Sequence, residues 1–419
     1  MPRLAPQLLR HARKIDPLLP LLLRPCRDLV SAQNELRWLR EHAIKTANNS
    51  EKRSRIAGWR TVLRQLVEER TTGKPLQYIL GTEYFGDLEI VCYPGVLIPR
   101  QETAASVTHL VDLLRQAEDL PSELRVLDLC TGTGCIPLLF QHEFNKARHD
   151  KGRLRLLGVD ISPIAVRLAR YNHMRLSNMR DLQRQERQMF KPGRDNDKKK
   201  NIAKPRYSTL DGTEDIGAGD TTEFMSADVL MDPLSDRYEM DAPPFVAEMN
   251  FENQPPFWDI LISNPPYISP SAFNRTTTHS VRVFEPKLAL VPPPSPGKSD
   301  EEQGDSFYPR LLTIANQVEA KLVLFEVADL EQAIRVARMA RDSDKWDGVE
   351  IWRDQPELES DSEDEELQEE FEVVGQGNGR SVLCWRGPAT QWLGKPASTI
   401  FTRRTPKKVW LLGQELEES

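Results

Sequence analysis

The sequence predicts an α/β fold in which a mostly parallel β-sheet carries helices on both faces. Short runs rich in apolar and β-branched residues alternate with segments of helical periodicity, which is the pattern of strand–helix–strand units. Seven runs are expected to be strands: residues 125–130, 155–160, 223–227, 258–263, 321–327, 348–353 and 381–385. No helical segment separates the last two runs, so we expect them to form an antiparallel pair at the end of the sheet.

Length and composition are typical of a folded protein of two or three domains. The chain has 419 residues, of which 39% are hydrophobic, and a net charge of −7. Residues 354–372 hold eleven acidic and no basic residues, so the rest of the chain carries 56 basic and 52 acidic residues. This body lacks the strong basic excess of a general nucleic-acid binder. No apolar run reaches the roughly 18 residues of a membrane span.

Cysteines and histidines form no pattern typical of a disulfide framework or a metal site. The cysteines are odd in number, lie far apart and include no C-x-x-C pair: Cys26, Cys92, Cys130, Cys135 and Cys384. The seven histidines form no H-E-x-x-H cluster. We therefore expect a reducing compartment and no metal site.

Residues 1–27 are rich in leucine and hold six basic residues against one acid, Asp16. An arginine-rich, acid-poor, amphipathic start is the composition of a mitochondrial transit segment. The alternative is a basic first helix of the folded domain. We expect a mitochondrial targeting segment here, with the cytoplasm as the other location.

Two small units precede the α/β domain. Apolar residues recur at helical spacing from Leu29 to Leu66, which predicts a helical domain over residues 28–75. Residues 76–104 alternate apolar and polar side chains between turn residues, which predicts a β-hairpin linker.

The α/β domain is expected over residues 105–387, with a C-terminal tail at 388–419. Three segments interrupt its pattern and are polar, proline-rich and acidic respectively: about 180–222, 292–304 and 356–370. Such compositions predict solvated surface insertions that are disordered at least in part.

A glycine-bearing turn, Cys130-Thr131-Gly132-Thr133-Gly134, follows the first predicted strand. Glycines here let the backbone approach a ligand closely at a helix N-terminus. The second strand ends at Asp160, whose carboxylate can accept hydrogen bonds from both ribose hydroxyls of a nucleoside. The third ends at Asp228-Val229, where an acid can meet an adenine amino group. The spacing differs from G-x-G-x-x-G and favours a nucleoside with a positive sulfur over a pyrophosphate; capping carboxylates are the alternative for both acids.

The fourth strand runs directly into Asn264-Pro265-Pro266-Tyr267. Two prolines fix the backbone and remove two donors, so carbonyls stay free to accept. The Asn264 side-chain oxygen and the Pro265 carbonyl can each accept a hydrogen bond from one planar NH₂ group, and Tyr267 offers it a flat face. We expect Asn264, Pro265 and Tyr267 to be catalytic, holding an sp² amine or amide in line for transfer. An ordinary proline-rich strand exit is the alternative.

These motifs resemble those of the S-adenosylmethionine-dependent amino-methyltransferases. Within them the chain is similar to the HemK/PrmC-type protein-(glutamine-N5) methyltransferases of peptide-chain release factors, of the bacterial or mitochondrial branch. Further segments carry the resemblance, which covers about residues 28–387 apart from the insertions: 73–79, 97–103 and 283–290. It implies a class I, Rossmann-like methyltransferase fold with a seven-stranded sheet, and a helical domain that docks the release factor.

The resemblance also implies the reaction and the site. S-adenosyl-L-methionine is the expected cofactor, and the expected methyl acceptor is the side-chain amide of glutamine in the Gly-Gly-Gln motif of a class I release factor. Implied cofactor contacts are Cys130, Thr131, Gly132, Thr133, Gly134, Asp160, Asp228, Val229 and Asn264. Implied substrate contacts are Asn264, Pro265, Pro266 and Tyr267.

Two side chains depart from the family's pattern. Cys130 replaces the usual first glycine of the loop, and the fold is expected to tolerate it if its φ is negative. Ala104 stands where the family usually has an acid, which removes a polar contact.

Two other functions use the same features. A DNA or RNA methyltransferase acting on adenine N6 or guanine N2 needs the same amine clamp, but the pI of about 5.7 and the lack of a basic, aromatic-interleaved region count against it. A non-catalytic binding protein with this fold would not need the intact clamp. We expect a monomeric enzyme with no membrane or nucleic-acid partner.

Overall fold

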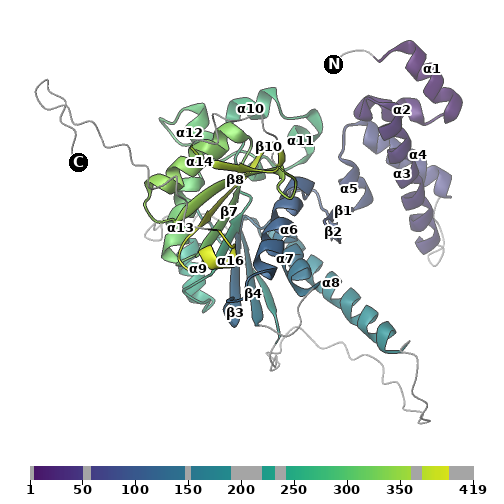
Figure 1. Ribbon diagram of the computed structural model, residues 1–419. Coiled ribbons are helices and arrows are strands. Elements are labelled where there is room, and N and C mark those ends of the chain that lie inside the picture. Colours follow the sequence, from purple (N-terminus) through teal and green to yellow (C-terminus); the bar gives the residue numbers. More distant parts are fainter. Residues whose placement is uncertain are drawn as a thin grey trace, which may run out of the picture.

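The computed structural model describes residues 4–50, 58–146, 152–189, 219–231, 242–359 and 370–395. They form a small helical domain, a β-hairpin and an α/β domain, in that order along the chain (Figure 1). Among the helices described, none combines the length and the apolarity that a bilayer crossing requires.

The helical domain begins earlier than predicted. It comprises α1 (Pro6–Ile15), α2 (Leu19–Cys26), α3 (Leu29–Ser50), α4 (Trp59–Thr71) and α5 (Leu76–Leu80). Leu19, Leu22 and Leu23 of α2 are buried in the same core as the apolar face of α3. The boundary at residue 28 is therefore wrong. These leucines have helical spacing, and Pro20 lies in the first turn, where a missing N–H costs nothing.

A hairpin connects the helical domain to the α/β domain, which confirms this part of the fold class. β1 (Thr82–Phe85) and β2 (Leu88–Val91) pair antiparallel, and Gly86 in the turn has a φ of 55°. Phe85 and Ile90 are fully buried in the core of the α/β domain. The Tyr78 hydroxyl of α5 donates to the Val96 carbonyl at 2.6 Å, which fixes α5 to the loop that leaves the hairpin.

All seven predicted strands lie in one eight-stranded sheet. They are β3 (Glu123–Leu129), β4 (Arg153–Asp160), β5 (Thr221–Ser226), β6 (Ile260–Ser263), β7 (Leu322–Glu326), β8 (Gly348–Gln355) and β10 (Gln376–Trp385). The order is β5-β4-β3-β6-β7-β10-β8-β9, and only β10 runs antiparallel to its neighbours. The additional strand β9 (Glu372–Val374) was not predicted, because three residues after an acidic run show no periodicity.

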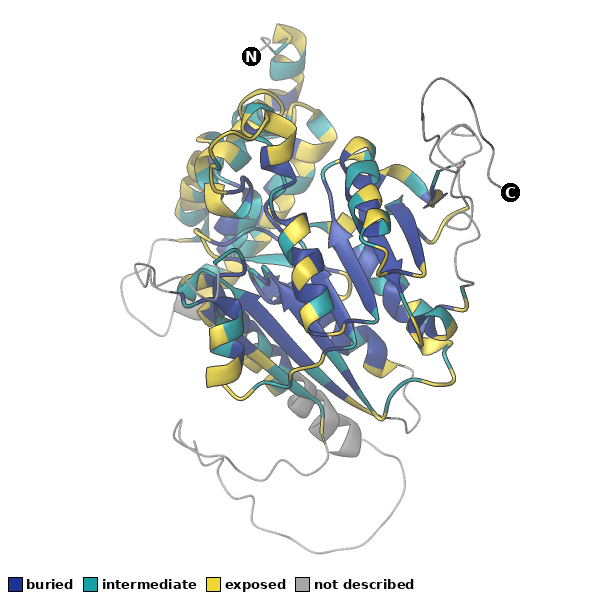
Figure 2. Ribbon diagram, turned by 90° about the vertical axis from the view of Figure 1, so that its left-hand side faces the viewer, coloured by how far each residue is buried: buried dark blue, intermediate teal, exposed yellow. Residues whose placement is uncertain are grey.

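Helices cover both faces of the sheet, and Figure 2 shows the buried strands between exposed helix surfaces. One face carries α6 (Gln101–Arg115), α7 (Cys135–Lys146), α8 (Pro163–Met189) and α16 (Ala389–Trp392). The other carries α9 (Phe245–Phe251), α13 (Tyr308–Gln317) and α14 (Leu330–Asp342). Short elements follow β6: α10 (Pro270–Arg275), α11 (His279–Phe284), η1 (Lys287–Ala289) and α12 (Asp300–Gly304). The carboxyl ends of the parallel strands meet at one edge, which is where such sheets place their sites.

The proline-rich segment 292–304 is part of the fold, not a disordered insertion. Ser299 and Glu302 form a capping box at the start of α12. The buried Gln303 side-chain amide donates to the Pro292 carbonyl at 3.3 Å. This side chain supplies a donor to carbonyls of the proline-rich segment, a contact that composition alone does not reveal.

The α/β domain also continues past residue 387. Trp392 of α16 is buried, and its indole N–H donates to a backbone carbonyl before β3 at 3.1 Å. α8 extends to Met189 and β5 begins at Thr221, so both ends of the predicted insertion at 180–222 are regular structure. Residues 190–218, 360–369 and 396–419 lie outside the described residues.

Candidate active site

The loop between β3 and α7 has three residues in the left-handed backbone conformation. They are Cys130 (φ 67°), Gly132 (φ 55°) and Gly134 (φ 77°). A Cβ on Gly134 would lie 2.9 Å from the Cβ of Ala169, so only glycine fits between the loop and α8. The condition under which the fold was expected to tolerate Cys130, a negative φ, is therefore not met. Cysteine occupies a conformation that favours glycine, at a cost of about 1–2 kcal/mol.

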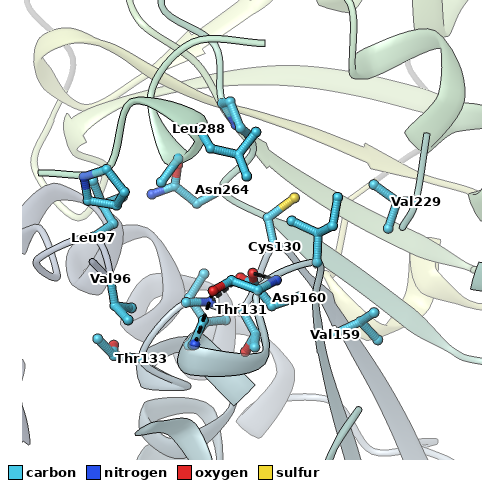
Figure 3. A pocket seen from close by; sticks show the side chains of 18 of the residues that line it. Val96, Leu97, Cys130, Thr131, Thr133, Val159, Asp160, Val229, Asn264 and Leu288 are labelled. Carbon is cyan, nitrogen blue, oxygen red and sulfur yellow. Dashed lines mark hydrogen bonds between the residues drawn. The ribbon is translucent and has the colours of Figure 1, made fainter. Parts of the chain in front are cut away.

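Asp160, at the carboxyl end of β4, holds this loop in place. Its two carboxylate oxygens accept hydrogen bonds from the Gly132 N–H at 2.8 Å and the Ser162 N–H at 2.9 Å (Figure 3). Burial raises the pKa of Asp160, although both backbone donors oppose the rise. Each oxygen keeps a further lone pair for a ligand, so the structural bonds do not exclude a binding role.

A cavity of about 420 Å³ lies at the carboxyl edge of the sheet. Most of the predicted site residues line it: Cys130, Thr131, Gly132, Thr133, Asp160, Asp228, Val229, Asn264 and Pro266. Gly134, Pro265 and Tyr267 are not among the lining residues. Val96 and Leu97 from the loop after the hairpin form further apolar walls (Figure 3).

Asp228 resembles Asp160 in its position, because it accepts from a backbone N–H and also faces the cavity. Its carboxylate accepts from the Leu230 N–H at 2.8 Å, and its side chain belongs to the cavity wall although the residue is only 8% exposed. Capping and ligand binding, weighed above as alternatives, are thus compatible for both acids.

Several buried polar atoms behind the cavity wall make no hydrogen bond of good geometry within the described residues. They include both carboxylate oxygens of Asp128 and the hydroxyls of Thr131 and Thr133. Burial raises the pKa of Asp128 well above the ordinary value of an aspartate. These atoms are shielded from the cavity as well as from solvent, and the Thr131 hydroxyl is near enough to Asp128 to oppose part of that rise, so the two side chains act on each other behind the cavity wall.

Asn264 follows β6 directly and is linked to a buried carboxylate on the next strand. Its side-chain Nδ2 donates to Thr103 Oγ1 at 3.3 Å, and the Thr103 hydroxyl donates to Glu326 at the end of β7. Burial raises the pKa of Glu326. Figure 3 places Asn264 on the cavity wall near Leu97 and Leu288, across from the glycine loop.

Tyr267 does not present a flat face to the cavity, contrary to the prediction. Its ring packs against the core, and its hydroxyl donates to Glu326 at 3.1 Å. The Tyr267 carbonyl accepts from the Gln332 side chain at 3.2 Å. Burial raises the pKa of Tyr267, so the hydroxyl remains a donor. The buried carboxylate needs this donor, which explains the position of the ring.

Sequence reasoning missed four polar residues around the cavity. Arg100 and Glu285 form a salt bridge at 2.7 Å, while Thr103 and Glu326 support Asn264. The first three lie in segments that resemble the family, but no role was assigned to them. Glu326 ends β7 as Asp160 ends β4, and an acidic residue near the end of the predicted strand 321–327 was the available signal.

Ala104, where the family usually has an acid, is buried in the apolar core of the α/β domain. It lies next to Thr103 in α6, and it does not line the cavity. The departure from the family's pattern therefore leaves the cavity wall unchanged.

Comparison of the sequence with known proteins finds relatives that are named as N(5)-glutamine methyltransferases. Mitochondrial MRF1 N(5)-glutamine methyltransferase MTQ1 of Saccharomyces cerevisiae is 30% identical over 295 residues, which is 70% of this chain and 68% of that protein. The chain belongs to the release factor N(5)-glutamine methyltransferase family. Probable MRF1 mitochondrial N(5)-glutamine methyltransferase mtq1 of Schizosaccharomyces pombe is 28% identical over 279 residues, covering 66% of this chain and 71% of that protein.

A bacterial member is also similar to this N(5)-glutamine methyltransferase. The release factor glutamine methyltransferase of Geobacter sulfurreducens is 29% identical over 227 residues, which is 54% of this chain and 53% of that protein. No protein-family model matches the chain.

Within the described residues of this methyltransferase, one group of potential metal ligands lies away from the cavity: Asp87, His142 and Glu143. The Lys146 ammonium pairs with both carboxylates, at 2.6 and 2.7 Å. The positive charge that these acids require is therefore already provided by the chain.

Proposed function

We propose that this enzyme methylates the side-chain amide nitrogen of the glutamine in the Gly-Gly-Gln motif of a class I peptide-chain release factor. The observation that carries the proposal is the position of Asn264, whose amide lies in the cavity wall across from the glycine loop and Asp160 (Figure 3). The names of the relatives support the substrate class. The Gly-Gly-Gln assignment rests on the family resemblance of residues 264–267.

The residues of the cavity suit S-adenosyl-L-methionine as methyl donor. Asp160 would accept from the ribose hydroxyls and Asp228 from the adenine amino group. The loop at 130–134 lines the cavity beside Asp160 and would contact the remainder of the molecule. When bound, S-adenosylmethionine supplies an electrophilic methyl group on a positively charged sulfur.

The chain's own contribution is to orient a weak nucleophile. An amide nitrogen reacts poorly because its lone pair is delocalised into the carbonyl. The Asn264 Oδ1 and the Pro265 carbonyl would accept from the substrate NH₂ and align it, which supplies the orientation that solution lacks. The same acceptors stabilise positive charge as it develops on the nitrogen.

Mass spectrometry of candidate substrates tests the proposal. The protein is incubated with methyl-labelled S-adenosylmethionine and, in separate reactions, with release factor, DNA and RNA. We expect label on the glutamine of Gly-Gly-Gln, and none on a release factor in which asparagine replaces that glutamine. Label on an adenine or guanine amino group instead would make the enzyme a nucleic-acid methyltransferase.

We further propose that the enzyme acts as a monomer in mitochondria. Two relatives are named as mitochondrial. In α1, Arg10, Arg13 and Lys14 are exposed while Ala12 is buried, so a basic surface coexists with a role in the fold. Cell fractionation of the full chain and of an Arg10→Glu/Arg13→Glu variant tests the location, which would be cytoplasmic if both distribute there.

A further inference from the structure

We propose that Glu326 and Thr103 are positioning residues that determine which end of the Asn264 side-chain amide faces the substrate. The proposal rests on the methyl-transfer function proposed above. Its basis is a chain of hydrogen bonds between three elements: α6 supplies Thr103, the segment after β6 supplies Asn264, and the end of β7 supplies Glu326. Thr103 is 5% exposed and Glu326 is 4% exposed, so water does not compete for these bonds.

The direction of the bonds follows from counting hydrogens. An ionised carboxylate donates none and a hydroxyl donates one. Glu326 accepts from the Thr103 hydroxyl on one oxygen and from the Tyr267 hydroxyl, at 3.1 Å, on the other. Thr103 has then used its hydrogen and can only accept from Asn264, whose Nδ2 lies 3.3 Å away. Asn264 therefore turns its NH₂ toward Thr103, which leaves Oδ1 to accept from the substrate.

The opposite orientation of Asn264 is excluded by the same network. It would place the Asn264 Oδ1 against the Thr103 Oγ1. Both atoms would then be acceptors, with no hydrogen between them. Thr103 could correct this only by turning its hydrogen away from Glu326, which leaves a buried carboxylate oxygen without a donor. The flipped amide would also present donors to a substrate NH₂ that is itself a donor.

The count of hydrogens requires the ionised form of Glu326. Burial raises the pKa of Glu326, and Glu102 adds to the rise, whereas the hydrogen bonds from Thr103 and Tyr267 and the positive charge of Arg380 favour the ionised carboxylate. Arg380 is held in place by Asp354, with a separation of 2.8 Å between guanidinium and carboxylate. The network thus includes a fixed positive charge beside its buried acid.

Three variants on α6 test the role of Thr103. Thr103→Val keeps the volume but removes the hydroxyl, and we expect kcat to fall at least about tenfold while the affinity for S-adenosylmethionine is unchanged. Thr103→Ser keeps the hydroxyl and should stay within about threefold of the parent kcat. Ser106→Ala is the matched control. It removes a buried hydroxyl one turn further along α6, where it contacts Ser381 at 3.0 Å, and should leave kcat unchanged.

Combining Glu326→Gln with Asn264→Asp distinguishes a positioning role from a merely structural one. A residue that only stabilised the fold would not raise kcat when it is replaced. The Asn264→Asp variant has no N–H to donate to Thr103. The Thr103 hydroxyl has one hydrogen, and the carboxylates of Asp at position 264 and of Glu326 would both need it as a donor. Glu326→Gln supplies an NH₂ that can donate to Thr103, which frees the hydroxyl to donate to the new carboxylate. We expect Glu326→Gln to lower kcat in the parent but to raise kcat in the Asn264→Asp variant, each by about threefold or more.

The outcomes separate the two proposals. If the parent labels no glutamine in the release factor, the proposed function fails. If the parent is active but Thr103→Val retains its kcat, or if Glu326→Gln lowers kcat in both backgrounds, the positioning role is overturned while the function stands.

Discussion

The Arg100 guanidinium pairs with the Glu285 carboxylate at 2.7 Å and joins segments 185 positions apart in the sequence. Glu285 also accepts the Ile98 N–H at 3.1 Å, and its side chain is 1% exposed. The pair therefore ties the loop that leaves the hairpin to the segment before η1. Both segments line the cavity, so this contact determines where two of its walls meet.

Glu285→Ala should weaken the binding of S-adenosylmethionine about tenfold. A buried N–H and a guanidinium lose their acceptor, which costs about 1–3 kcal/mol in the wall of the site. Isothermal calorimetry measures the affinity. Asp112→Ala is the control, because it removes an exposed pair with Arg115 on α6 and should change little. Equal affinities for the two variants would show that the walls do not depend on the pair.

Asp160→Ala should weaken S-adenosylmethionine binding by at least tenfold, since two charge-assisted hydrogen bonds contribute roughly 1.5–3 kcal/mol each. The pH dependence has a definite sign. Burial raises the pKa of Asp160, so its acceptor form is lost on acidification at a higher pH than for an ordinary aspartate near about 4. Affinity should fall as the pH is lowered toward that range. Unchanged calorimetric affinity in the variant would remove Asp160 from the site.

Cys130→Gly should give a more stable protein than Cys130→Ala, by about 1 kcal/mol or more. Both variants lack the thiol, so their difference isolates the penalty that a Cβ incurs at a φ of 67°. Equilibrium unfolding in urea measures the free energies. An alanine variant as stable as the glycine variant would mean that the loop relaxes without strain.

Asn264→Ala should lower turnover roughly 10²–10³-fold, by analogy with the loss of one preorganised polar group. Asn264→Asp should keep partial activity, because it retains an oxygen acceptor. Both variants should still bind S-adenosylmethionine, which calorimetry can verify. Turnover of Asn264→Ala at the parent rate would show that the amide is held by other residues.

Removal of residues 1–72 should reduce methylation of the whole release factor more than methylation of a Gly-Gly-Gln tip peptide. The helical domain offers a second contact far from the chemistry, and the isolated peptide cannot use it. The cut must include α1 and α2, because deletion from residue 28 would leave Leu22 and Leu23 without their core. Retained affinity for S-adenosylmethionine is the control. Equal losses on protein and peptide would argue against docking by this domain.

The fold could be predicted from sequence because its signals are local. A buried parallel strand such as β6 (Ile260–Ser263) appears as a continuous apolar run, and polar residues such as Asp160 and Asn264 follow strand ends directly. The positions of these side chains at one edge of the sheet then follow from topology. Most of the predicted residues line the cavity, whereas Gly134, Pro265 and Tyr267 do not.

The remaining features depend on contacts between distant segments. Thr103 meets Glu326 across 223 positions, and no period or motif connects the two. The orientation of Tyr267 follows from that buried carboxylate, so it could not be inferred before Glu326 was placed. The positive φ of Cys130 could not be predicted either, because the usual signal for this conformation is a glycine and this position holds a cysteine.

β10 lies between β7 and β8 although it follows both in the sequence. During synthesis, β7 and β8 remain without this partner until residues 376–385 have left the ribosome. Unpaired strand edges invite aggregation and are recognised by cellular quality control. A nonsense mutation as late as codon 375 should therefore behave as a null allele, even though every residue of the candidate active site has already been translated.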